Sequence, residues 1–156
     1  MRTIIFVLVL LAVAGLAYIR LAPSDPERWH VDPSASSAPG RGGWKVAPEG
    51  GNQAAPVWAA DPAEVLAAVD AVAMATPRTT RLAGSVADGR ISYVTRTRIM
   101  GFPDYTTVTA RSAPGGATLT MLARQRFGSD DLGVNRARLE GWLAALSDRL
   151  DQAGPT

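Results

Sequence analysis

Arginine is the residue type in this chain whose spacing could do chemistry. On two segments of alternating pattern it repeats at every second position, as Arg96 and Arg98 and again as Arg124 and Arg126. Residues two apart on a strand point to the same face, so each pair shares a face. If both strands present those faces on one side of a sheet, four guanidinium groups converge. Such a surface suits a phosphate or a carboxylate, which arginine binds through paired hydrogen bonds.

The segment after the second pair adds polar residues at the expected start of a helix. The residues that complete this candidate anion site are Ser129, Asp131, Asn135 and Arg136. The unpaired backbone N–H groups and the positive dipole end of the helix would lie beside the arginine face. The same residues are equally suited to capping the helix and to pairing with arginines. In that alternative, the arginine face is a solvated surface with structural ion pairs.

Residue types used in catalysis are scarce. The chain has no cysteine, which excludes thiolate nucleophiles, Cys-ligated metals and disulfides. Its one histidine, His30, lies outside the expected domain, which excludes a Ser-His-Asp triad or a multi-histidine metal site within that domain. Asp104 could form an acid–base pair with Asp130 or Asp131, but acids among arginines are expected to stay ionised and paired. We therefore predict no catalytic residue, no metal site and no cofactor.

Length and charge bound the number of domains and the partners. The chain has 156 residues and a formal net charge of +2, which is too close to neutral to predict a nucleic-acid partner. Once the apolar N-terminus and a stretch rich in Pro and Gly are set aside, the remaining length is enough for one modest core. A single domain is therefore expected.

The N-terminus carries an uncharged segment, residues 3–19, between Arg2 and Arg20. At a rise of about 1.5 Å per residue it spans roughly 26 Å. With the apolar residues that follow Arg20, this length is sufficient for one transmembrane helix. A basic residue precedes the segment and acidic residues dominate after it, so the N-terminus is expected in the cytoplasm and the domain in the periplasm. We predict a bacterial inner-membrane anchor over residues 1–21. The alternative is a signal peptide cleaved after a small-x-small site at residues 12–14, which would release the protein into the periplasm.

Residues 22–56 are predicted to form an extended spacer. They hold six prolines and five glycines and show no apolar periodicity. Trp29 and Trp44 lie within this stretch, and tryptophan is costly to leave in water. The alternative is therefore that parts of the spacer pack on the domain or on the lipid interface.

The α+β fold class is predicted for residues 57–151, followed by a tail over 152–156. The capping-box sequence Asp61-Pro62-Ala63-Glu64 starts a helix that ends near Ala75. A stripe of Leu and Trp predicts the last helix over 134–150. Between them, period-two runs predict strands over residues 79–86, 90–100, 105–111 and 117–127. The expected architecture is a helix, a four-stranded antiparallel meander and a C-terminal helix packed on the sheet.

Two segments resemble a known family. The first is Phe102-Pro103-Asp104-Tyr105, and the second, over 123–136, follows the form Arg-x-Arg-x-Gly-x-Ser-Asp-Leu-Gly-x-Asn-x-x-Arg. They are similar to the family catalogued as domain of unknown function 1499, over roughly residues 57–150. An additional acid stands beside Asp131 here, so either Asp130 or Asp131 corresponds to the family's aspartate. The resemblance implies domain limits and a membrane-anchored or exported location in bacteria, and it implies no reaction.

These observations predict a membrane-tethered binding or accessory module in the periplasm that recognises an anionic small molecule or a lipid headgroup. One alternative is a structural subunit of an inner-membrane complex, which would bind a membrane-protein partner. Another is an enzyme acting on an anionic or lipid-linked substrate. That activity, which we do not expect, would need Asp104, Asp130 or Asp131 poised near the arginines.

Overall fold

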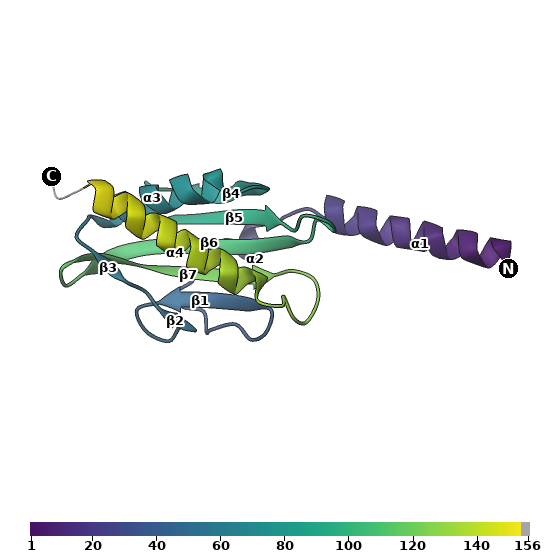
Figure 1. Ribbon diagram of the computed structural model, residues 1–156, viewed down its shortest axis with the longest axis horizontal. Coiled ribbons are helices and arrows are strands. Elements are labelled where there is room, and N and C mark those ends of the chain that lie inside the picture. Colours follow the sequence, from purple (N-terminus) through teal and green to yellow (C-terminus); the bar gives the residue numbers. More distant parts are fainter. Residues whose placement is uncertain (154–156) are drawn as a thin grey trace.

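Four consecutive antiparallel strands form the centre of the computed structural model, which describes residues 1–153 (Figure 1). These strands are β4 (Thr79–Ser85), β5 (Arg90–Arg96), β6 (Pro103–Ala113) and β7 (Gly116–Gln125). Each pairs with the next along the chain, which confirms the predicted meander. The β-branched residues in these runs favour the extended backbone.

The sheet is larger than expected and is mixed. Three short strands precede the meander in the chain, namely β1 (Gly43–Ala47), β2 (Gln53–Ala54) and β3 (Val57–Trp58). β1 and β3 pair antiparallel with β7, and β2 pairs parallel with β1. The seven-stranded sheet has the order β2-β1-β7-β6-β5-β4, with β3 beside β7 off this path. These strands correct the prediction of four strands, because they supply hydrogen-bond partners for the otherwise open edge of β7.

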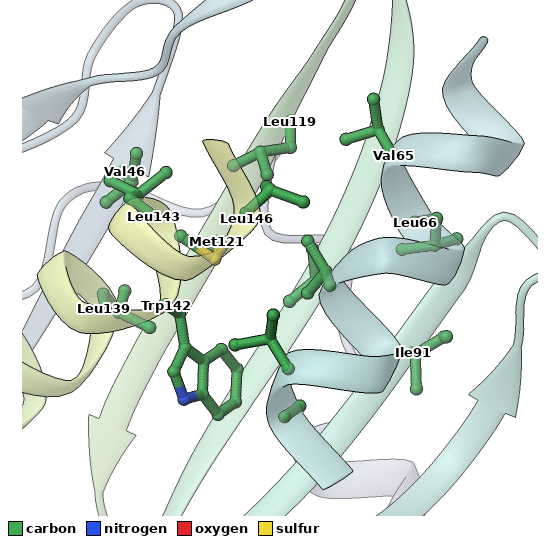
Figure 2. Packing of buried hydrophobic residues seen from close by; sticks show 14 of the residues in the cluster. Val46, Val65, Leu66, Ile91, Leu119, Met121, Leu139, Trp142, Leu143 and Leu146 are labelled. Carbon is green, nitrogen blue, oxygen red and sulfur yellow. The ribbon is translucent and has the colours of Figure 1, made fainter. Parts of the chain in front are cut away.

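Two helices cover one face of the sheet and bury the main core between them and the strands. α3 (Pro62–Ala75) begins with the predicted capping box, and α4 (Val134–Ala153) carries the predicted stripe of leucines. Figure 2 shows the α4 side chains over the sheet, with the Trp142 indole between α4 and α3. The Trp142 Nε1 donates to Thr76 Oγ1 over 2.9 Å, and the ring meets Tyr93 edge-on.

The other face of the sheet is covered by the strap, which we define as residues 22–42 and which includes the short helix α2 (Pro26–Trp29). Trp29 is only 6% exposed and stacks on Tyr105, with 3.9 Å between ring centres. Thr107 Oγ1 donates to the Trp29 carbonyl oxygen over 3.1 Å. Residues 22–56 therefore do not form the expected extended spacer. They form the strap, β1 and β2, because the sheet offers apolar and polar surface on which they pack.

α1 (Arg2–Leu21) projects from one end of the domain and has no buried side chain. It is long and apolar enough to cross a membrane, a test that a signal sequence also passes. In Figure 1 the loop between β5 and β6 and the loop between β7 and α4 lie at the same end as α1. We call this end of the domain, with those two loops and the start of α4, the α1 end.

Candidate anion-binding site

Two of the predicted site residues, Arg124 and Arg126, lie beneath the strap. The Arg124 guanidinium carbon is 5.1 Å from the centre of the Trp29 ring, and burial lowers the pKa of Arg124. Arg126 Nη1 donates to the Pro23 carbonyl oxygen over 2.7 Å. Both side chains therefore bind the chain's own backbone and rings, and they hold the strap on the sheet.

Arg96 and Arg98 lie at the α1 end, where β5 ends. β5 ends at Arg96, whose Nη1 donates to the Gly101 carbonyl oxygen over 3.0 Å, and Arg98 is exposed in the turn that follows. The sequence pattern did not reveal that the strand ends between these two residues. The four arginines consequently do not form a single site.

The predicted helix start is capped by its own loop. Asp131 accepts hydrogen bonds from the backbone N–H groups of Gly133 and Asn135, each over 3.0 Å. Asp130 forms an ion pair with Arg41, and the hydrogen bond from the Leu132 N–H, together with Arg41, lowers the pKa of Asp130. The prediction had these backbone N–H groups binding an anionic ligand. Asp131 binds them instead, as expected if the loop serves to cap the helix.

The remaining predicted residues of this loop differ in environment. Ser129 is exposed. Arg136 pairs with Glu140 one turn along α4, and its guanidinium lies 5.0 Å from the centre of the Trp44 ring. Asn135 is fully buried. Of the three, only Asn135 contacts Arg138, which belongs to a buried polar cluster beneath α4.

That buried cluster joins β6 to α4. Arg138 Nη1 lies 3.4 Å from Asp104 Oδ2, with side chains 8% and 5% exposed, and Arg138 also donates to Asn135 Oδ1. Burial raises the pKa of Asp104 and the Arg138 charge opposes that rise, while burial lowers the pKa of Arg138. Within the described chain, two buried polar atoms of the cluster have no hydrogen-bond partner, namely Arg138 Nε and Asn135 Nδ2.

Arg138 is the functional candidate that the sequence prediction missed. It stands three residues after Asn135, a spacing that places both side chains on one face of a helix. It also stands two residues beyond the longer family segment, at the last arginine of the Asn-x-x-Arg form. That spacing was the available signal, whereas the contact with Asp104 depends on the packing of α4 against β6.

A groove of about 720 Å³ opens beside this cluster, between the C-terminal end of α3 and α4. This volume lies within the range of about 300–1,000 Å³ that is typical of small-molecule sites. Its apolar walls include Val72, Ala75, Val134, Ala137, Trp142 and Ala145. Its arginines are Arg78, Arg96, Arg98, Arg138 and Arg149. Among the described residues no Asp or Glu lines the groove, so its lining is strongly cationic.

Arg78 occupies a special backbone position at the rim of this groove. Its φ of 61° is in the left-handed region, which a residue with a Cβ adopts at a cost of about 1–2 kcal/mol. Arg78 Nε donates to the Arg96 carbonyl oxygen over 3.1 Å, so the side chain lies along the end of β5. The turn after α3 therefore directs a guanidinium toward the groove in spite of backbone strain.

His30 contacts the domain, which corrects the expectation that it lies outside. Its Nδ1 is 2.9 Å from Ser92 Oγ, which in turn is 2.8 Å from Thr107 Oγ1. Burial and the nearby Arg90 hold the pKa of His30 below its ordinary value. Ser92 is fully buried, so a substrate has no access to this hydroxyl, and the bonds fasten the strap. Within residues 1–153, no group of three His, Asp or Glu side chains could hold a metal ion.

Comparison with known proteins gives the family. The model of a family described as "Protein of unknown function (DUF1499)" matches residues 20–146. The chain belongs to the DUF1499 family. The match begins in the last turn of α1 and includes the strap and β1. The two segments of the sequence resemblance meet through Tyr105 with Arg126, and Asp104 also pairs with Arg138, just beyond the longer segment.

Two solved structures are similar to this DUF1499 domain. Protein CV1439 from Chromobacterium violaceum is 16% identical with a TM-score of 0.48, over 74% of this chain and 99% of that one. Protein MLL2253 from Mesorhizobium loti is 20% identical with a TM-score of 0.36, over 47% of this chain and 55% of that one. No curated protein matches the chain.

Proposed function

We propose that this protein is a membrane-anchored periplasmic binding module whose groove takes an amphiphile with an anionic head. The observation that carries the proposal is the composition of the groove. Its walls are mostly apolar, five arginines line it, and no Asp or Glu of the described chain does so. Hydrocarbon would lie against the apolar walls, and a phosphate or carboxylate would bind the guanidinium groups.

The arginines differ in how they would serve this ligand. Arg78 and Arg98 are exposed at the rim, where they can reach an entering head group. Arg138 lies in the floor, already paired with Asp104, and its buried Nε has no partner in the described chain. The rim residues would therefore attract the anion, while the buried pair would keep the floor in shape.

The position of the groove supports the anchoring. Its part at the ends of α3 and β5 and the start of α4 lies at the α1 end, so a membrane-spanning α1 would bring that part close to the lipid surface. A basic residue precedes α1, which favours a cytoplasmic N-terminus and a periplasmic domain in a bacterial inner membrane. Cleavage of α1 as a signal peptide would instead release the same domain into the periplasm.

The groove can be tested by filling it. A Cβ added at Gly141, which lines the groove on α4, has no atom within 4 Å. Gly141→Leu should fold and block the groove, and Gly141→Ala is the matched control. For residues 22–156, a lysophosphatidic acid or a long-chain fatty acid should raise the melting temperature. Ligand at a hundredfold excess over Kd stabilises by about 2.7 kcal/mol.

The expected pattern is a shift for wild type and Gly141→Ala, and none for Gly141→Leu. A monoacylglycerol, which has the hydrocarbon without the charge, should give a much smaller shift. Unchanged melting with both acidic probes would overturn the proposal. Stable co-purification of the full chain with an inner-membrane protein, together with such unchanged melting, would favour the role of a structural subunit.

A further inference from the structure

A second hollow, of about 460 Å³, lies at the α1 end next to the groove. Four arginines line it, and we call them the arginine cradle. They are Arg20, which the groove lacks, together with Arg78, Arg96 and Arg98, which line the groove as well. None of the four forms an ion pair with a described Asp or Glu. Two threonines, Thr80 and Thr97, also line the hollow.

We infer that the arginine cradle binds the phosphate of an anionic phospholipid in the leaflet where α1 ends. The inference rests on the membrane anchoring proposed above and not on the ligand of the groove. Its central observation is that the last turn of α1 and the domain contribute guanidinium groups to one hollow.

The cradle's hydrogen bonds leave its charge available. Arg20 Nη2 donates to the Ile99 carbonyl oxygen over 2.5 Å, and Arg78 and Arg96 likewise donate to carbonyl oxygens. A guanidinium has five N–H donors, so one bond to a neutral carbonyl fixes its position and leaves donors for a phosphate. The backbone therefore holds these side chains in place without neutralising them.

Gly101 permits the contact with α1. Its φ is 72°, and a Cβ there would lie 3.1 Å from Cγ of Arg20 and 3.3 Å from its Nε. A larger residue would therefore be strained and would press on the Arg20 side chain. The loop between β5 and β6 is in this way shaped to receive the end of α1.

The surroundings of the cradle identify a bilayer as its partner. Ile99 is 78% exposed and Met100 is 41% exposed, on the turn that contacts Arg20. Tyr18 of α1 meets the Phe127 ring edge-on at 6.3 Å, and aromatic residues of this kind concentrate at membrane interfaces. The uncharged segment of α1 ends at residue 19, one position before Arg20. Arg20 would therefore lie at the level of the headgroups, where phosphates are the available anions.

The test uses the full-length protein in lipid nanodiscs. The melting temperature of the domain should rise as phosphatidylglycerol replaces phosphatidylcholine, and salt should weaken the rise. Loss of one cradle arginine, in Arg98→Ala or Arg20→Ala, should lower the apparent affinity for phosphatidylglycerol about fivefold. Arg111→Ala is the matched control, because Arg111 is an exposed arginine near the other end of β6. It should keep the wild-type affinity.

The other outcomes separate the cradle from the groove and from the anchoring. Gly141→Leu should keep the response to phosphatidylglycerol, and loss of the response would place the headgroup in the groove and overturn the cradle. An equal rise with inorganic phosphate in phosphatidylcholine nanodiscs would overturn the assignment to lipid. A response that survives in Arg20→Ala and Arg98→Ala would also overturn the inference. Release of the protein by carbonate would overturn the anchoring and this inference, while the groove would still be testable on residues 22–156.

Discussion

Asp104 and Arg138 form a buried ion pair, 3.4 Å apart, that joins the start of β6 to the first turns of α4. Asp104 belongs to the shorter family segment, and Arg138 is the last arginine of the form that the longer segment follows, so the pair links the two motifs. The pair also supports the groove, because Arg138 is one of its lining residues. Its energetics give the first two predictions.

Removing one partner of this pair should destabilise the domain strongly. Asp104→Asn leaves Arg138 as a buried cation, and Arg138→Met leaves a buried carboxyl group. Each should lower the free energy of unfolding by about 3–5 kcal/mol. The double variant should lose clearly less than the sum of the single losses, because no charge is left unpaired. Chemical denaturation of residues 22–156 measures the free energy of unfolding for wild type, the two single variants and the double variant. Additive losses would show that the pair is not coupled.

The stability of Arg138→Met should depend on pH through Asp104. Burial raises the pKa of Asp104 above its ordinary value of 3.8, so in the window between these two values the folded state binds more protons than the unfolded state. Stability therefore falls as pH rises through that window. Without the Arg138 charge, which opposes the rise in pKa, the window should extend to higher pH. Melting temperatures of Arg138→Met should fall with increasing pH relative to the double variant. If the melting temperatures of the two variants changed with pH in parallel, the assignment of the pH dependence to Asp104 would be contradicted.

Arg78→Gly should separate stability from binding. Glycine adopts a positive φ without steric cost, which relieves about 1–2 kcal/mol, offset in part by the greater freedom of glycine in the unfolded chain. A net gain of up to about 1 kcal/mol is expected. Affinity for the anionic probes should fall at the same time, since Arg78 lines both hollows. Denaturation and thermal-shift titration measure the two effects. Arg98→Ala is the control, with weaker binding and stability within about 0.5 kcal/mol of wild type.

Trp29→Ala should loosen the strap from the sheet. The Trp29 ring is buried, stacks on Tyr105 and lies against Arg124, so its loss should cost about 3–5 kcal/mol. Trp29→Phe keeps an aromatic ring on Tyr105 and should cost clearly less. Limited proteolysis should cut Trp29→Ala within residues 22–42 earlier than wild type. Equal resistance of the two proteins would show that the strap does not depend on this ring.

The sequence by itself determined the elements that carry strong local signals. The capping box at Asp61 begins α3, and Pro77 ends it. The alternation of β-branched residues specifies the meander, and the spacing of leucines specifies α4. An uninterrupted apolar run specifies α1. In each of these segments, the period of the pattern matches the geometry of one kind of element, so neighbouring residues are sufficient to recognise it.

Tertiary structure decided the remainder, because the relevant energies come from residues distant in the sequence. β1 is short and the strap is rich in Pro, and they are ordered by the edge of β7 and by the ring of Tyr105. The alternating pattern could place Arg124 and Arg126 on one face of a strand, but only packing determined that the strap covers that face. Arg78 is far in the chain from Arg138 and Arg149 of α4, and they line one groove because α3 and α4 pack side by side on the sheet.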